Sequence, residues 1–394
     1  EAITLYLKGT GGEGLASGFP NPPATYYGQV LSSAYFTPTP GLAVTAWVGD
    51  QLCGQAVTQE EGGLVVYVVM PLWADAYYLS VANMVGYTVL GALGVQLLIG
   101  YCGQVTLGHA AFLAVGAYTS TLLILQVPWP EFMLVSGLAY PLSIFLAAVV
   151  AGLWSLLFGL PSARVKGFYL ILTTMAAQFI TVDFVITQYV SQIGGRGQAF
   201  SLPPGTIKIG PWVIDSDLKV YYMMIVLVIL LTALVVNLLR SRVGRAWVAI
   251  RDNDISAEVM GINVVQYKLM AFFVAGFIGG VAGAFWISNL AAISPEHFPW
   301  FWSLWLVGVI LIGGVGSIHG TIFGSIFMVV VMELLQMAVI PLASSYPKLL
   351  MDFLFIKEAA FGLAICAFMI FEPNGLAYRW WQAKNYFNLW PFSY

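Results

Sequence analysis

The sequence predicts a mainly α-helical protein that crosses a membrane about eight to ten times, with discontinuous pore helices and a small β-rich region at its N-terminus. Hydrophobic residues make up 60% of the 394 residues and charged residues only 8%, whereas a water-soluble domain carries about a quarter charged residues. Apolar runs of about twenty residues, which match the thickness of a bilayer, recur along the chain. Most of the polypeptide is therefore expected to lie in the membrane.

The N-terminal region, residues 1–69, differs from everything after it. It is rich in Pro, Gly and Thr, and strand-forming residues alternate at 44–48, 51–57 and 64–69. The Gly-Asp pair between the first two runs suits a two-residue hairpin loop, so we expect a small antiparallel meander. So short a region buries little core by itself. We expect it to be extracytoplasmic, either as a cap on the pore mouth or as a landing surface for a partner protein.

Nine apolar segments follow the N-terminal region, and each is long enough to be a candidate span. They are residues 75–100, 106–126, 137–160, 167–190, 220–240, 267–290, 300–315, 320–341 and 349–371.

The densest positive charge lies between the fifth and sixth segments, at Arg240, Arg242, Arg245 and Arg251. Because cytoplasmic loops carry an excess of Lys and Arg, we assign this loop to the cytoplasm. Counting membrane crossings back from this loop then places the N-terminal region outside the cytoplasm, provided that the segment before residue 100 crosses the membrane fully. A re-entrant half-helix there would reverse that assignment. The chain begins at a glutamate rather than a methionine, which is compatible with removal of a signal peptide or of an upstream helix.

The stretch GYCGQVTLGHAAF, residues 100–112, places glycines and polar residues between two apolar runs. At membrane depth such an interruption is tolerated only where it is buried in protein or lines a wet cavity, so it predicts a translocation path. A helix that starts at His109 would offer its first amides to an anionic group such as a carboxylate. The structural alternatives are that His109 is simply packed in the interior and that the Thr173 and Thr174 hydroxyls bond back to carbonyl groups of the preceding turn of their own helix. The candidate path residues are Gly103, Gln104, Thr106, Gly108, His109, Thr173 and Thr174.

Glycines recur in two further patterns. GGVGSIHG, residues 313–320, is a second interruption between apolar runs and resembles the first. Gly276 and Gly280, and likewise Gly279 and Gly283, lie four residues apart on one helix. Small residues at this spacing allow helix backbones to approach closely, and helix packing is the favoured interpretation.

Ionisable residues are few within the predicted spans, where they are costly and often functional. Asp183, Glu333, Asp352 and Glu358 lie within or near spans, and Lys357 adjoins the last of them. Anchoring at the membrane interface is the favoured interpretation. Since the acids do not recur along one helix, a proton relay is disfavoured.

Several classes of function are disfavoured by the residues that the chain carries. The three cysteines are scattered without a C-x-x-C pair, so neither a zinc site nor a disulfide framework is indicated. A net charge of −3 gives no sign of nucleic-acid binding. The three histidines are far apart and show no nucleophile–base pairing, so we expect no catalytic site and no cofactor bound by this chain. The sequence contains no G-x-x-x-x-G-K-[ST] phosphate loop, so any ATP hydrolysis would need separate subunits.

Four stretches resemble the transmembrane permease subunits of branched-chain amino-acid ABC importers, the LivM-type permeases. GYCGQVTLGHAAFLAVGAY is similar to the pore signature of that family, and GRAWVAIRDNDISAEVMGINVVQYKLMAFFVAGFIGGVAGAF to its ATPase-coupling loop and the next helix. GGVGSIHGTIFG and EPNGL match two further stretches. The matches cover about residues 72–380 in the family's order and leave out residues 1–69.

The resemblance implies a permease in the bacterial cytoplasmic (inner) membrane that carries a branched-chain or related small amino acid. Its expected partners are a second permease subunit, cytoplasmic ABC ATPases that use ATP and Mg²⁺, an extracytoplasmic solute-binding protein and membrane lipid. It also implies a transmembrane domain at 70–380 with a coupling loop at 241–267, followed by a tail at 381–394. The residues implied to mediate ATPase coupling are Gly244, Arg245, Arg251, Asp252, Asn253, Glu258 and Gly261.

Two other interpretations remain open at the level of sequence. A secondary transporter or channel would also use broken helices, but it has no need of an elaborate cytoplasmic loop. A structural or docking subunit of a membrane assembly would use residues 1–69 as its interaction module. The solute, and the choice between a homodimer and a heterodimer, are not readable from these residues.

Overall fold

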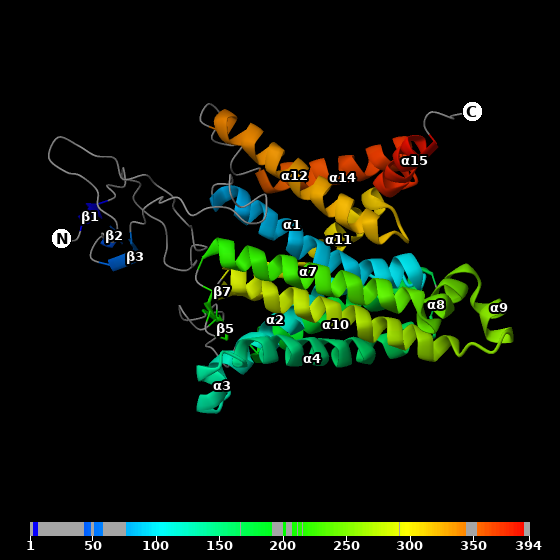
Figure 1. Ribbon diagram of the computed structural model, residues 1–394, viewed down its shortest axis with the longest axis horizontal. Coiled ribbons are helices and arrows are strands. Elements are labelled where there is room, and N and C mark those ends of the chain that lie inside the picture. The colour runs from blue at the N-terminus through cyan, green and yellow to red at the C-terminus, as the bar shows by residue number, and fades with distance from the viewer. Residues whose placement is uncertain are drawn as a thin grey trace. The chain divides into compact units, whose positions relative to one another are not determined.

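The structure is a computed structural model that divides the chain into two compact units, Glu1–Leu72 and Trp73–Tyr394 (Figure 1). The residues that it describes are 3–6, 43–48, 51–57, 76–165, 167–190, 200–201, 207–210, 212–214, 216–290, 292–343 and 353–389.

The described part of the first unit is a three-stranded sheet, ordered β1 (Ile3–Tyr6), β2 (Ala43–Val48) and β3 (Gln51–Val57). Val48 pairs with Gln51 in antiparallel register, which confirms the predicted hairpin. The sheet is not purely antiparallel as expected, because β1 pairs with β2 in parallel. Parallel pairing needs a long connection, and the segment between β1 and β2 provides one. The strand predicted at 64–69 lies outside the described residues.

The second unit is built almost entirely of helices, which confirms the predicted fold class. In chain order they are α1 (Ala76–Val95) with its π-helical continuation η1 (Gln96–Tyr101), α2 (His109–Gln126), α3 (Glu131–Val135), α4 (Ala139–Ser162), α5 (Phe168–Phe179) with its π-helical continuation η2 (Ile180–Val190), α7 (Asp217–Arg240), α8 (Arg242–Asp252), α9 (Asp254–Val259), α10 (Val264–Leu290), the short 3₁₀ turn η3 (Pro295–His297), α11 (Trp300–Gly313), α12 (Ile318–Ala343), α14 (Phe353–Phe371) and α15 (Gly375–Leu389).

Two short strand pairs lie in the connections between helices. The pair β4 (Phe200–Ser201) with β7 (Ala292–Ile293) joins the loop before α7 to the end of α10. The pair β5 (Lys208–Ile209) with β6 (Trp212–Val213) lies within the loop before α7.

Within the described ranges, eight helices are long and apolar enough to cross a bilayer. Each coincides with a segment predicted from the sequence, and the ends differ by a few residues because capping and packing set them more than hydropathy does. The ninth predicted segment, at 349–371, corresponds to α14, whose described part begins at Phe353. The multi-pass membrane character of the chain is therefore confirmed.

The helix α1 crosses the whole second unit, from one end to the end that carries α8 and α9 (Figure 1). A Cβ added at Gly103, just beyond η1, would lie 3.2 Å from the Cα of Arg251 in α8. At the opposite end of the unit, the turn at Gly137 packs against the backbone of Gly210, in the loop that precedes α7. Of the two topologies left open by the sequence, the structure shows the full crossing before the first interruption.

Small residues bring α2, α4 and α10 into close contact, as predicted. A Cβ added at Gly280 in α10 would lie 2.7 Å from the Cα of Ala148 in α4. One added at Gly283 would overlap the backbone carbonyl of Leu113 in α2. Such glycines allow helix backbones to pack at short range without a large hydrophobic driving force.

The C-terminal boundary differs from the one implied by resemblance, because residue 380 lies inside α15. Across the turn before α15, the Arg379 Nε donates a hydrogen bond of 2.7 Å to Glu372 Oε1. This bond lowers the pKa of the Glu372 carboxyl from its usual value and raises the pKa of Arg379. We therefore expect the bond to persist at neutral pH and to be lost as the pH falls through the lowered pKa of Glu372.

Candidate functional site

The first interruption, residues 102–108, joins η1 to α2 and packs against α5. A Cβ added at Gly108 would overlap the carbonyl oxygen of Thr174, so glycine is required for this close approach. The amide of Leu107 donates to Thr174 Oγ1 at 3.1 Å, and the amide of Gly108 donates to Thr106 Oγ1 at 3.3 Å. Four of the predicted path residues, Thr106, Gly108, His109 and Thr174, are therefore brought together in the protein interior.

Two of the first amides of α2 have acceptors within the protein in this conformation. The Ala110 amide donates to Ser303 Oγ of α11 at 2.9 Å, and the Ala111 amide donates to the carbonyl oxygen of Gly108. Neighbouring polar groups thus satisfy these two amides, and the binding of an anionic group at this helix start stays a prediction.

Back-bonding of the two threonines, the structural alternative, is confirmed. Thr174 Oγ1 donates to the carbonyl oxygen of Ile171 at 3.0 Å, and Thr173 Oγ1 donates to that of Leu170 at 2.8 Å. Thr174 Oγ1 also accepts a hydrogen bond from the Leu107 amide. The same hydroxyl therefore bonds to its own helix and holds the first interruption in place.

His109 is completely buried and lies among α1, α2 and α10. Cβ atoms added at Gly94 and Gly279 would lie 2.6 Å and 3.2 Å from its Nε2. Its ring meets that of Phe112 edge to face at 5.7 Å. Among the described residues, neither ring nitrogen has a hydrogen-bond partner, and the same is true of Gln104 Oε1. Buried polar atoms without partners are costly, so we expect them to bind water or solute in another conformation.

The second interruption, residues 314–317 between α11 and α12, contacts η1, the helical segment that leads into the first interruption. Gln96 Nε2 of η1 donates to the carbonyl oxygens of Gly314 and Ser317 at 3.2 Å and 3.0 Å. A Cβ added at Gly100 would lie 2.8 Å from the amide nitrogen of Gly316. We call this contact between residues 100–103 and 314–317 the helix-break joint. The resemblance between the two glycine stretches thus corresponds to a direct contact in space.

The helices α8 and α9 form a compact loop that is anchored to α10. The Trp247 side chain is completely buried, and its Nε1 donates to the carbonyl oxygen of Tyr267 at 2.8 Å. Lys268 Nζ lies 3.8 Å from Asp254 Oδ2 at the start of α9. These contacts indicate that the loop moves with α10 rather than independently of it.

The polar residues expected to mediate ATPase coupling lie in different environments. Asn253 Oδ1 caps α9 by accepting from the amides of Ile255 and Ser256. Arg245 Nη1 donates to the carbonyl oxygen of Arg240 at 3.1 Å. Three further residues of this set are exposed: Asp252, Glu258 and Gly261. Gly244 is buried. Arg251 bonds to Gly100 in the helix-break joint.

This loop also exposes apolar side chains, a feature that the motif of polar residues did not indicate. Ile255, Val259 and Met260 are 67%, 83% and 82% exposed. We call these three residues the α9 tip. Ile255 and Val259 are four residues apart and therefore lie on one face of the helix, a pattern that the sequence contained. An exposed apolar cluster on an otherwise well-packed loop indicates a protein-binding surface.

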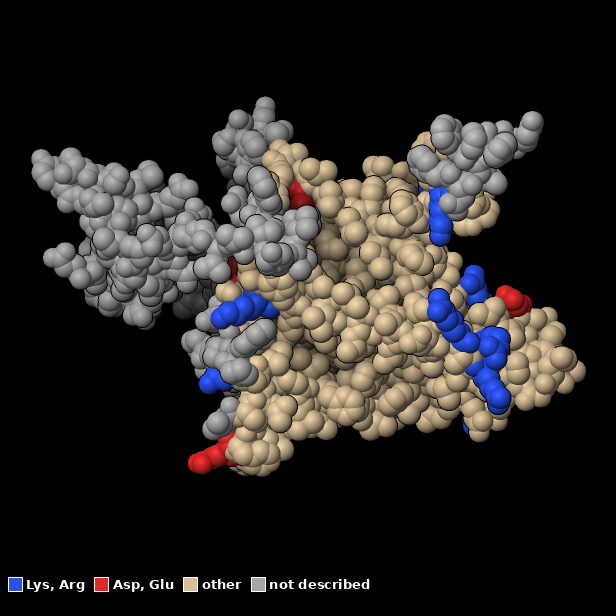
Figure 2. All heavy atoms as spheres, viewed as in Figure 1, with Lys and Arg blue, Asp and Glu red and all other residues tan. Residues whose placement is uncertain are grey.

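Positive charge surrounds the base of this loop. Figure 2 shows a group of Lys and Arg side chains at the end where Figure 1 labels α8. The four arginines predicted to lie in the cytoplasm, Arg240, Arg242, Arg245 and Arg251, belong to α7 and α8 at this end.

The ionisable residues of the spans fit the anchoring interpretation where they are described. Asp183 is exposed. Glu333 Oε2 accepts a hydrogen bond of 2.7 Å from the Tyr77 hydroxyl, and Lys357 Nζ donates to Gln336 Oε1 at 3.3 Å. Asp352 lies outside the described residues.

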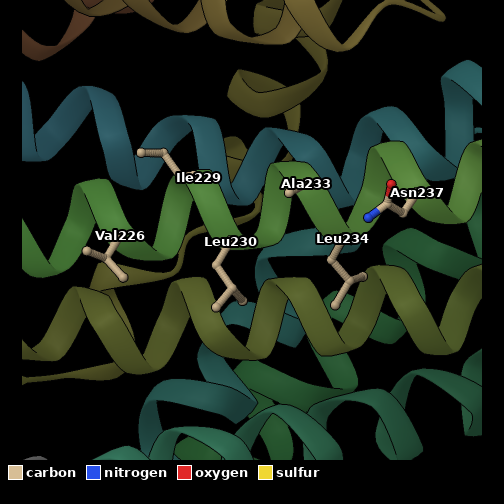
Figure 3. Close-up of a pocket in the computed structure, with 6 residues that line it drawn as sticks. All are labelled: Val226, Ile229, Leu230, Ala233, Leu234 and Asn237. Carbon is tan, nitrogen blue, oxygen red and sulfur yellow. The ribbon is translucent and has the colours of Figure 1, made fainter.

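A shallow apolar groove of about 600 Å³ lies on the outer face of α7 (Figure 3). Its lining side chains all come from this one helix, and Val226, Ile229 and Leu230 are 61%, 63% and 55% exposed. An apolar stripe of this kind suits contact with lipid or with another membrane helix. It contains none of the predicted path residues.

The fold and the site define a polytopic membrane protein whose two interrupted helix pairs meet beside a rigid, positively charged loop. A model of the branched-chain amino acid transport system permease component matches residues 77–357. The chain belongs to this family of transport permeases.

Named relatives agree with the family model. The chain is 26% identical over 334 residues to the high-affinity branched-chain amino acid transport system permease proteins LivM of Salmonella typhimurium and Escherichia coli, covering 79% of this chain and 73% of each relative. It is 24% identical over 242 residues to a probable branched-chain amino acid transport permease protein LivM of Methanocaldococcus jannaschii, covering 60% of this chain and 67% of the relative. No solved structure matches the chain significantly.

Proposed function

We propose that this chain is the permease subunit of a bacterial ABC importer in the cytoplasmic membrane, where it forms the path for a branched-chain or related small amino acid. Membership of the permease family supports this proposal. The sequence has no phosphate-binding loop, so the energy comes from separate ATPase subunits. The solute class follows the names of the relatives, and a solute-binding protein delivers the solute from outside.

The α9 tip is the observation that carries the proposal. It places three exposed apolar side chains at the end of a loop that Trp247 and Lys268 anchor to α10. The surrounding arginines assign that end of the protein to the cytoplasm. A rigid apolar projection on the cytoplasmic side is suited to a groove in an ATPase, because desolvation of such a cluster favours binding.

The second permease subunit and membrane lipid cover the outer helix faces, of which the α7 groove is one example. This arrangement leaves the cytoplasmic end of each permease free to bind one ATPase. The polar atoms around His109 and Gln104 that lack partners in this conformation are the groups that we expect to meet water or solute when the path opens.

Replacement of Val259 by Asn tests the docking role of the α9 tip. The 83% exposed side chain contributes little to the fold, so we expect the variant to be produced normally but to lose most of the ATPase that copurifies in mild detergent. The matched control is Val127→Asn, at an exposed apolar position that follows α2 at the other end of the unit. Equal ATPase recovery with both variants would contradict ATPase docking at the tip, whereas a wild-type chain that copurifies with no ATPase would favour a self-sufficient transporter.

A further inference from the structure

The carbonyl group of Gly100, in the helix-break joint, requires a hydrogen-bond donor from outside its own helix. Gly100 lies in the last turn of η1, where the helix ends at Tyr101. The last carbonyl groups of a helix have no downstream amide to accept from, so they need other partners. The negative end of the helix dipole also favours a cation at this place.

Arg251 supplies both the donor and the charge. Its Nη1 donates a hydrogen bond to the carbonyl oxygen of Gly100. A Cβ added at Gly316 would lie 2.8 Å from the same nitrogen, and one added at Gly103 would lie 3.2 Å from the Arg251 Cα. Gly103 and Gly316 have φ values of +71° and +85°, which glycine adopts readily. The Arg251 side chain therefore contacts both sides of the helix-break joint at once.

Arg251 lies near the C-terminal end of α8, between a buried anchor of the loop and the cap of α9. It lies one helical turn after Trp247, whose side chain is completely buried. It lies two residues before Asn253, which caps α9. Only Asp252 and Asn253 separate Arg251 from the start of α9, so we expect a displacement of the α9 tip to reach Arg251 through a short connection.

We propose that Arg251 is the positioning residue that couples movement of the α8–α9 loop to opening of the helix-break joint. The guanidinium holds the two interruptions together in the present conformation. When the loop moves, the bond to Gly100 breaks, and η1 separates from the start of α12. This inference rests on the proposed function, because it needs an ATPase to move the loop, but the contact itself does not depend on transport.

Arg251→Ala in the assembled complex tests the coupling role. In liposomes we expect the variant to keep its ATPase subunits and to hydrolyse ATP, while the amount of solute transported per ATP falls about tenfold, within the usual range of coupling effects. Arg251→Lys retains a charged donor and should recover part of this ratio. Arg242→Ala, a change of an exposed arginine at the other end of α8, is the control.

Hydrogen exchange tests the contact without transport. The backbone amides of residues 100–104 and 314–317 should exchange faster in Arg251→Ala than in the wild-type protein or in Arg242→Ala. This measurement also applies if the alanine variant transports no solute.

The outcomes separate this inference from the proposed function. If the wild-type complex shows no ATP-driven uptake, the proposed function is wrong, and hydrogen exchange alone decides whether Arg251 holds the joint. If the wild type transports and Arg251→Ala keeps the normal ratio of solute to ATP, the coupling role is wrong. Loss of the ATPase subunits from Arg251→Ala would also overturn it, because it would show that Arg251 acts in docking.

Discussion

Asn253 lies between α8 and α9, and its side chain turns back to the chain rather than outward to a partner. The amides of Ile255 and Ser256 donate to its Oδ1 at 3.1 Å and 3.0 Å. An asparagine in this position satisfies two amides of the first turn, which otherwise have no intrahelical acceptor. If the loop couples to an ATPase as we propose, Asn253 contributes by setting the direction in which the α9 tip projects.

Replacement of Asn253 by Ala should weaken ATPase binding without touching the binding surface. Loss of such a cap costs about 0.5–2 kcal/mol, and if the frayed helix must be ordered again on binding, the Kd for the ATPase rises about 2- to 30-fold. Asn253→Ser retains a capping oxygen and is the control. The Kd can be measured with the permease in lipid nanodiscs. An unchanged Kd for the alanine variant would contradict this role of the cap.

At the residue scale, the sequence identifies candidate functional residues more reliably than it predicts which groups their side chains contact. Arg251 was expected to contact an ATPase, but it contacts Gly100, because the rotation of α8 about its axis depends on burial of Trp247. His109 was a candidate for the path or for packing; its side chain is packed in this conformation, and its place in the path stays a prediction. Such orientations follow from tertiary contacts that one sequence does not contain.

At the scale of elements, close packing of α10 on α2 depends on Gly283. A Cβ there would overlap the carbonyl oxygen of Leu113, and backbone cannot rotate away as a side chain can. The predicted small-residue pattern is therefore a requirement of the helix interface.

Gly283→Ala should lower the stability of the membrane domain by about 1–3 kcal/mol, the usual cost of overpacking. The apparent midpoint of thermal unfolding in detergent measures this effect. Gly362→Ala in α14 is the matched control, since a Cβ there meets no atom within 4 Å. The control should be neutral or slightly stabilising because alanine is the better helix former. Equal midpoints for the two variants would contradict the close packing.

The spans could be predicted because hydropathy over about twenty residues reports burial in lipid directly. The expected segment at 220–240 and the observed α7, Asp217–Arg240, differ only at the start. The parallel pairing of β1 with β2 was missed, because parallel partners are distant in sequence and leave no local turn signal.

At the scale of the whole molecule, the membrane unit brings two interruptions that are far apart in sequence into one joint beside the coupling loop. The sequence contained both glycine stretches and their similarity, but not their contact, which depends on how α1 and η1 pack against α11 and α12. The location of residues 1–69 outside the cell stays a prediction. Arg251 joins the loop to this joint, and we propose that this contact connects the loop mechanically to the path.

The most direct test of the central claim is ATP-driven uptake by the complex. The tagged chain is purified in mild detergent with its copurifying subunits, reconstituted into liposomes and supplied with solute-binding protein and radiolabelled leucine. The account predicts accumulation that requires ATP, is lost on Val259→Asn and persists in Val127→Asn. Recovery of the chain without an ATPase, or leucine uptake that proceeds equally without ATP, would contradict it.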